Sequence, residues 1–243
     1  MRSENQVLAV DAGNTSIKIA YFNNQHLEIV KRFDNQDLKK IEDWSKLLDI
    51  EKVFVSSVLN SVDTKLLLNC FDNPYLITHN SKTPIKNQYL TPNTLGIDRL
   101  ANVCYANTAA KTEYAVCIDV GTCIKFDVVH KTKGYLGGSI APGIDLRYKA
   151  LNDYTGNLPL LSEKSKPELI GRDTKQSIQS GVLNGIECEI QQFIQRYEEQ
   201  FDDLTFFMTG GDARFFDLHS KNDIFADENL TLKGLYEIYK INA

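Results

Sequence analysis

The chain has 243 residues, which is long enough for two domains of about 110 to 130 residues each. Its 27 basic and 32 acidic residues give a net charge of −5, and neither sign gathers in a long block, which argues against a nucleic-acid or an anionic-membrane surface. Only a short apolar run precedes Asp11, so we expect neither a signal peptide nor a membrane span, and we expect a cytoplasmic protein. The five cysteines form no CxxC pair, so no zinc site is expected.

The first half is predicted to alternate strands with helices, as in a layered α/β domain. β-Branched and aromatic residues fill the strand candidates, and Asn23 and Asn24 mark a turn in an antiparallel start. The predicted strands are 7–11, 16–22, 27–33, 53–57 and 75–77, and the predicted helices lie near 36–48, 62–70 and 94–108.

The second half repeats this strand pattern, so we interpret the chain as a duplicated domain, with one copy in residues 1–113 and the other in 114–243. Glycines and a proline in 135–143 indicate a loop that fits closely against another backbone or a ligand. Helices are predicted for 144–151, 174–201 and 232–241, and a strand for 204–208.

A short signature follows an apolar strand in each half: Asp11-Ala-Gly-Asn-Thr15 and Asp119-Val-Gly-Thr122. Glycine lets backbone N–H groups approach a phosphate, hydroxyl and amide side chains add hydrogen bonds, and aspartate can hold a cation. Alone, such a sequence could be only a tight turn. Its recurrence, with Thr209-Gly-Gly-Asp-Ala213 at a third strand end, favours nucleotide binding, because strand ends line the ligand crevices of α/β sheets.

Five blocks, in order along nearly the whole chain, resemble the type III pantothenate kinases, which belong with acetate kinases, sugar kinases, heat-shock ATPases and actin. The blocks are 11–18, Gly96-Ile-Asp-Arg99, 119–122, 137–143 with Leu158-Pro159, and 171–174 leading to Gly181, and 209–213 completes the series. The Gly-x-Asp-Arg block is the most specific of them. The resemblance implies an α/β fold of two ribonuclease-H-like (actin-like ATPase) domains with mixed sheets, an active site in the cleft between them, and a homodimer.

The resemblance also implies transfer of the γ-phosphoryl group of ATP to the primary hydroxyl of pantothenate, the first step of coenzyme A synthesis. Asp98 matches the proton acceptor, while Arg99 and a helix N-terminus suit the pantothenate carboxylate. Alone, these two residues would be ordinary solvated charges at a helix start. The implied substrate contacts are Tyr89, Gly96, Ile97, Asp98, Arg99 and Thr174. Without the resemblance, Tyr89 would be a surface tyrosine and Thr174 a helix cap.

The resemblance assigns ATP to both signatures. The implied ATP-binding residues are Asp11, Ala12, Gly13, Asn14, Thr15, Ser16, Ile17, Lys18 and Thr122. Asp11 would orient magnesium through water. Lys18 would neutralise phosphate charge, although strand alternation alone would explain it as a lysine that points to solvent.

Asp119 matches the position that binds a monovalent cation, potassium or ammonium, in cation-dependent members of the family. This chain departs from the family just afterwards, because Cys123-Ile-Lys125 stands where small or hydroxyl residues are usual. The Lys125 ammonium would replace the cation in part, repel it, or simply face solvent. Two rival functions remain open: another small-molecule kinase of the superfamily, and a catalytically silent nucleotide-binding regulator. Acetate and sugar kinases are generally longer and lack Gly-x-Asp-Arg in this place.

Overall fold

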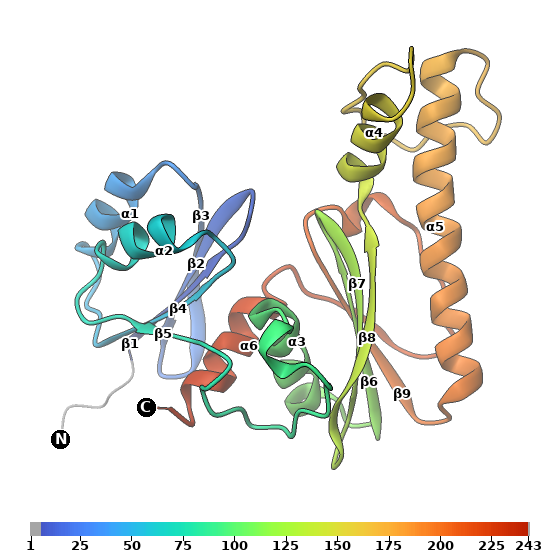
Figure 1. The fold of residues 1–243 in the computed structure, drawn as a ribbon. Coiled ribbons are helices and arrows are strands. Elements are labelled where there is room, and N and C mark those ends of the chain that lie inside the picture. The colour runs from blue at the N-terminus through green and yellow to red at the C-terminus, as the bar shows by residue number, and fades with distance from the viewer. Residues whose placement is uncertain (1–5, 243) are drawn as a thin grey trace. The chain divides into compact units, whose positions relative to one another are not determined.

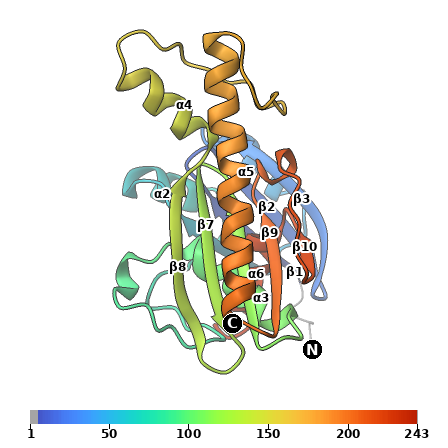
Figure 2. The same cartoon turned by 90° about the vertical axis from the view of Figure 1, so that its right-hand side faces the viewer.

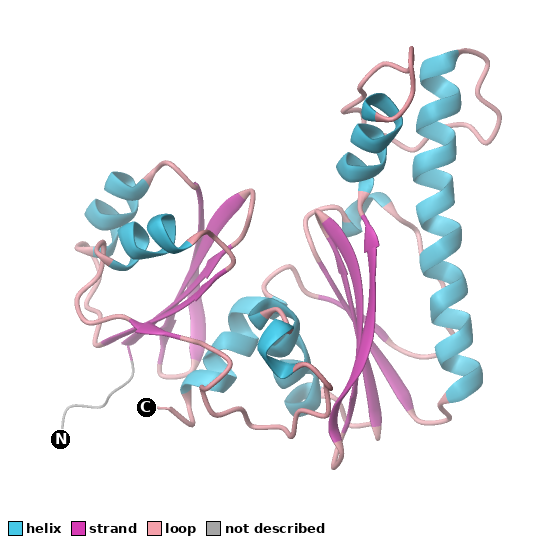
Figure 3. Ribbon diagram, viewed as in Figure 1, coloured by secondary structure: helices cyan, strands magenta, loops and turns pink. Residues whose placement is uncertain are grey.

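A computed structural model describes residues 6–242. The chain divides into two compact units. The first unit runs to Thr108 and includes the chain from Asn229 onward, and the second is Ala109–Glu228. Figures 1 and 3 follow the chain through its helices and strands.

The first unit contains a five-stranded mixed sheet in the order β3-β2-β1-β4-β5. Its strands are β1 (Gln6–Ala12), β2 (Ser16–Asn23), β3 (His26–Asp34), β4 (Lys52–Ser57) and β5 (Tyr75–Leu76). The first three strands form an antiparallel meander, while β4 runs parallel to β1 and β5 runs parallel to β4. The antiparallel start and the alternation with helices therefore match the sequence prediction.

Strand alternation sends side chains of the first unit to two different helix layers. On one face, Leu8, Val10 and Val55 pack with Trp44 of α1 (Leu38–Ser45) and Leu67 of α2 (Ser61–Leu68). On the other face lies α6 (Leu230–Tyr239), with α3 (Ile97–Ala109) beside it (Figure 1). A 3₁₀ turn, Pro92–Thr94, leads into α3.

The C-terminal helix α6 belongs to the first unit, which differs from the predicted division at residue 113. The Tyr236 ring of α6 stacks on Phe22 of β2, with the ring centroids 4.3 Å apart. A Cβ added to Gly234 would overlap the Ala101 carbonyl of α3, so only glycine lets the two helices approach this closely. These contacts join residues more than a hundred positions apart in the sequence, so no local sequence pattern predicts them.

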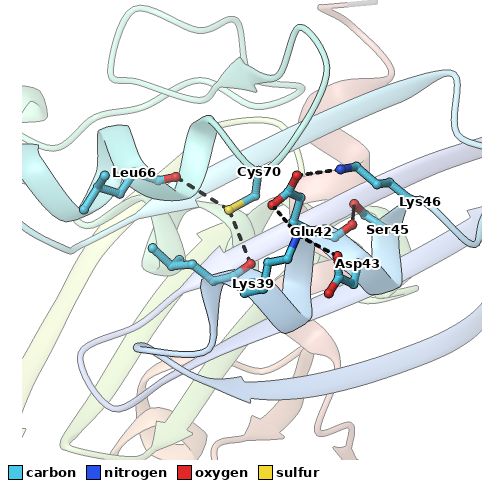
Figure 4. Close-up of polar contacts among 8 residues, drawn as sticks. Lys39, Glu42, Asp43, Ser45, Lys46, Leu66 and Cys70 are labelled. Atoms are coloured by element: carbon cyan, nitrogen blue, oxygen red, sulfur yellow. Dashed lines mark hydrogen bonds and ion pairs between the residues drawn. The ribbon is translucent and has the colours of Figure 1, made fainter.

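Polar contacts join α1 and α2 at the surface of the first unit (Figure 4). Lys39 lies 3.0 Å from Asp43, and Lys46 pairs with Glu42 at 2.5 Å. The Cys70 thiol, just after α2, lies 3.6 Å from the Leu66 carbonyl of α2 and 3.6 Å from the Leu38 carbonyl of α1, so it connects the two helices. Exposed ion pairs of this kind contribute little to stability, on the order of 0.2–1 kcal/mol each.

The second unit repeats the sheet of the first, with the order β10-β9-β6-β7-β8. Its strands are β6 (Tyr114–Val120), β7 (Cys123–His130), β8 (Gly134–Pro142), β9 (Leu204–Thr209) and β10 (Ile224–Ala226). As in the first unit, the central strand pairs antiparallel with the strand after it and parallel with a later one. The repeated order confirms the predicted duplication. The short strand β10 was not predicted.

The long helix α5 (Thr174–Gln200) covers one face of this second sheet (Figure 2). Its residues Ile178, Val182, Ile186 and Ile190 recur every four positions and lie in the core, as the sequence spacing predicts. The helix α4 (Ile144–Asp153) follows β8 and packs against α5. Among the described residues, no helix is long and apolar enough to cross a membrane.

The strand β8 (Gly134–Pro142) takes up all but the last residue of the loop predicted over 135–143, so that prediction is wrong. The glycines that suggested a loop instead permit close strand pairing: a Cβ on Gly138 would overlap the Phe126 carbonyl of β7. Gly137 has φ +128° at the register shift between Val128 and Val129, a conformation that only glycine adopts readily. The expected close fit against another backbone is confirmed.

Candidate active site

The first glycine turn joins β1 to β2. The Gly13 N–H donates to the Ser16 carbonyl at 3.1 Å, and Asn14 and Thr15 are exposed at the tip. The Asn35 side-chain amide donates to the carbonyls of Gly13 at 3.2 Å and Asn14 at 3.0 Å. Asn35 therefore holds the turn from the segment after β3. Sequence reasoning missed it, and its only local signal was a turn-forming residue after a strand.

Asp11 and Lys18 lie directly opposite each other in the antiparallel register of β1 and β2. Both side chains are partly exposed. Ser56 of β4 lies beside Asp11 on the other flank. Ala12 and Ile17 are different, because their side chains are fully buried and leave only their backbones to a ligand.

The second glycine turn joins β6 to β7, and the ends of three strands meet there. The Gly121 N–H donates to the Cys123 carbonyl at 3.1 Å, and Thr122 is exposed at the tip. From the end of β8, the Gly143 N–H donates to the Thr122 carbonyl at 3.0 Å. A Cβ at Gly143 would overlap the backbone of this turn, so the position requires glycine.

The turn after β9 also packs on this place. Gly210 has φ +100°, and a Cβ there would overlap the backbone of Val120. The Asp212 N–H donates to the Val120 carbonyl at 3.0 Å. The structure thus brings together three of the glycine-containing blocks: 119–122, 137–143 and 209–213. Strand ends that converge in this way are the usual ligand-binding edge of an α/β sheet.

Lys164 links this edge to the segment between α4 and α5. Its ammonium lies 2.9 Å from the Asp145 carboxylate and 3.0 Å from that of Asp212. Burial opposes the charge, but hydrogen bonds to Asp145 and Asp212 outweigh it and raise the pKa of Lys164. Sequence reasoning missed Lys164, which has no motif around it.

Asp119 forms an ion pair with Lys125 in the second hairpin. The Lys125 Nζ lies 2.7 Å from the Asp119 Oδ2, and the two side chains are only 17% and 14% exposed. Among the alternatives left open for Lys125, a side chain that simply faces solvent is therefore wrong. Its ammonium contacts one oxygen of the carboxylate to which the family resemblance assigns a cation.

The start of α3 gathers four of the predicted substrate residues in the first unit. The Asp98 carboxylate folds back over Gly96, where a Cβ would overlap its Oδ1. Arg99 is only 4% exposed, and its guanidinium carbon lies 5.8 Å from the centroid of the Tyr89 ring. Arg99 is thus not a solvated surface charge. Ile97 is buried in the core, so only its backbone can face a ligand.

Thr174 lies in the second unit, where it is exposed as the first residue of α5. It lines an open, mostly apolar groove of about 780 Å³ between α4 and α5, whose lining also includes Arg147, Leu158, Ile178 and Gly181. Arg147 pairs with Glu189 across the two helices at 2.5 Å. The structure therefore places Thr174 in a different unit from Tyr89, Asp98 and Arg99.

Comparison with known proteins settles the family. A family model of type III pantothenate kinases matches residues 7–196. The chain belongs to the type III pantothenate kinase family. A type III pantothenate kinase of Christiangramia forsetii is 39% identical over 239 residues, which cover 97% of this chain and 98% of that protein. One of Bacteroides fragilis is 38% identical over 237 residues, with 97% and 98% covered. These matches confirm the family predicted from the sequence blocks.

Solved structures confirm the fold class. A conserved putative Baf family transcriptional activator from Campylobacter jejuni superposes with a TM-score of 0.63 at 24% identity, covering 97% of this chain and 98% of the other. An inorganic polyphosphate/ATP-glucomannokinase from Arthrobacter sp. gives a TM-score of 0.51 at 13% identity, with 98% and 99% covered. At these identities the likeness concerns the fold alone. It agrees with two ribonuclease-H-like domains, as the duplicated sheet order also indicates.

Proposed function

We propose that this chain phosphorylates pantothenate with ATP to give 4′-phosphopantothenate, the first step of coenzyme A synthesis. Phosphorylation of pantothenate is the activity for which its family is named, and the family is a class of phosphotransferases. The observation that carries the proposal is the start of α3, where Asp98 folds over Gly96 and Arg99 is buried under Tyr89. This is the Gly-x-Asp-Arg block that sets the family apart in sequence.

In this proposal the two hairpin turns hold ATP. Residues 11–18 and Thr122 offer backbone N–H groups, exposed hydroxyls and the Lys18 ammonium to the phosphates. Magnesium accompanies ATP, and Asp11 would hold it through water. Oxygen donors suit this ion, and the described residues contain no cluster of three or more His, Cys, Asp or Glu, so phosphate and water would supply its other ligands.

Asp98 would act as the general base. The pantothenate hydroxyl oxygen bonds to the γ-phosphorus, the bond from that phosphorus to the β,γ-bridging oxygen breaks, and the hydroxyl proton passes to the Asp98 carboxylate while ADP leaves. Phosphoryl transfer of this kind depends mainly on alignment and charge neutralisation. Arg99 and the N–H groups at the start of α3 would hold the pantothenate carboxylate, because a helix N-terminus favours an anion. Thr174 and Tyr89 would complete the substrate contacts.

A positive charge beside Asp119 would offset the charge of the phosphates. The resemblance assigns that charge to a monovalent cation, potassium or ammonium. The Lys125 ammonium at 2.7 Å offers a second source. If a bound monovalent cation supplies the charge, activity should depend on potassium or ammonium; if Lys125 supplies it, activity should not.

The protein would act as a homodimer in the cytoplasm, where ATP is available. Large apolar side chains support a partner on the second unit, since Tyr154 is 89% exposed and Leu169 and Ile170 are exposed to a similar degree. The expected result is a dimer mass in size-exclusion chromatography with light scattering. A monomer at micromolar concentration would contradict this part of the proposal.

The proposal is tested by ADP release from ATP and magnesium in the presence of pantothenate, acetate or simple sugars. Turnover that requires pantothenate supports it. Turnover with another acceptor would point to a different kinase of the superfamily. Nucleotide binding without turnover on any acceptor would favour the silent regulator.

A further inference from the structure

The two hairpins carry the same pairing of an aspartate with a lysine. Asp11 lies opposite Lys18 across β1 and β2, and Asp119 lies opposite Lys125 across β6 and β7. In both hairpins the aspartate is the last residue but one of the strand before the glycine turn. The lysine at 125 is therefore the counterpart of Lys18 in the second copy of the domain. Side chains that lie directly opposite in antiparallel strands interact, so the register places Lys125 to contact Asp119 at this turn.

The Asp119 carboxylate is held between the turn and the lysine. A Cβ built on Gly121 would lie 3.8 Å from the Asp119 Oδ1, so that oxygen faces the turn. The other oxygen, Oδ2, lies 2.7 Å from the Lys125 Nζ. Because both side chains are largely shielded from water, this pair is screened less than a surface pair.

A potassium ion does not fit beside this pair. Its anionic ligand would be the carboxylate that already binds an ammonium, and two unit positive charges about 4 Å apart at an effective dielectric constant of about 20 repel enough to weaken binding roughly 1,000-fold. Potassium and ammonium are the ions that the resemblance calls for. A lysine side chain is itself an ammonium, fixed to the protein by its alkyl chain.

Building on the proposed kinase function, we propose that Lys125 permanently supplies the cation at the second phosphate turn, so that the enzyme requires neither potassium nor free ammonium. Lys125 is then a positioning residue. It neutralises Asp119 and keeps a positive charge beside Gly121 and Thr122, where the phosphates of ATP would bind. Asp119 fixes the ammonium and binds no metal ion.

Cation substitution tests this inference with two readouts. The affinity for magnesium–ATP, measured by calorimetry, and the initial rate with pantothenate are compared in potassium, ammonium, sodium and tetramethylammonium chloride at constant ionic strength. The wild type is expected to change less than about 2-fold across the four salts, whereas Lys125→Met is expected to bind ATP at least about 10-fold more weakly in tetramethylammonium. Potassium or ammonium should restore the variant's binding in a saturable way. The matched control is Lys111→Met, an exposed lysine of the same unit, which should behave as the wild type.

Saturable activation of the wild type by potassium, of about 10-fold or more, would overturn the inference. Wild-type ATP affinity of Lys125→Met in tetramethylammonium would overturn it as well. Should Lys125→Met fail to fold, the wild-type salt series decides alone. ATP binding that is equal in all salts, with no turnover of pantothenate in any, would refute the proposed function and leave the inference standing. No ATP binding in any salt would refute both.

Discussion

The guanidinium carbon of Arg99 lies 5.8 Å from the centroid of the Tyr89 ring, within the range of a cation–π interaction. Arg99 is nearly buried, so this ring helps to fix the direction of its charge. Both residues were predicted from the sequence as pantothenate contacts, and the structure places them side by side.

Replacement of Tyr89 by leucine is expected to raise the KM for pantothenate about 5- to 10-fold with little change in kcat, because the lost interaction of roughly 1 kcal/mol frees Arg99. Steady-state kinetics with varied pantothenate measures this. The Tyr89→Phe variant keeps the ring and should stay within about 2-fold of the wild type. Equal KM values for the leucine variant and the wild type would refute the role of the ring.

Replacement of Asp98 by asparagine should lower kcat by about 100-fold or more, because a neutral isostere cannot accept the hydroxyl proton. ATP affinity should be nearly unchanged, as measured by calorimetry. Asp72→Asn, at an exposed position of the same unit, is the matched control and should keep full activity. Near-normal turnover by Asp98→Asn would exclude this residue as the base.

Replacement of Asn35 by alanine should weaken ATP binding by up to about 30-fold, because two hydrogen bonds to the carbonyls of Gly13 and Asn14 are lost, each worth about 1 kcal/mol. The KM for pantothenate should not change. Asn80→Ala, at an exposed position of the first unit, serves as the control. Unchanged ATP affinity would show that the first turn needs no support from Asn35.

Tyr148 is expected to make the free energy of unfolding fall at alkaline pH. Burial, and then the charges of Glu163 and Asp145, raise its pKa to about 12, and its hydroxyl donates to the Glu163 carbonyl at 2.9 Å. The folded state retains this proton at a pH where the unfolded chain, with an ordinary pKa near 10, has lost it. Stability from this group is therefore complete below about pH 10 and falls as the pH rises toward 12. In denaturant unfolding at pH 8 to 11, the free energy of unfolding should fall less steeply with pH for Tyr148→Phe than for the wild type. Parallel pH profiles of the two proteins would contradict this.

Much of the site can be predicted from the sequence because the patterns that indicate it lie within short stretches of chain. The Asp-x-Gly turns follow strongly apolar strands, and Gly96 to Arg99 opens a helix, so neighbouring residues suffice to predict them. Asn35 and Lys164 act across long stretches of chain, through carbonyls and carboxylates that no spacing relates to them. The strand β8 was wrongly predicted as a loop for a related reason. Its glycines are required by the close approach of the β7 backbone and do not form a turn.

The packing position of α6 and the ion pair of Lys125 could also not be predicted from the sequence alone. The sequence predicts an amphipathic helix at the end of the chain but not the sheet on which it packs, and Phe22 and Phe54 become visible as its partners only in three dimensions. For Lys125, the sequence left open whether the side chain lies near the expected cation position or faces solvent. The strand register decides between them, because it sets the lysine directly opposite Asp119.

The most direct test of the central claim is the product itself. Purified protein is incubated with ATP, magnesium and pantothenate, and the products are resolved by phosphorus NMR and mass spectrometry. The account predicts a single phosphomonoester on the primary hydroxyl of pantothenate, formed in equal amount to ADP and absent with Asp98→Asn. ADP without phosphopantothenate, or no reaction at all from a folded protein that binds ATP, would contradict it.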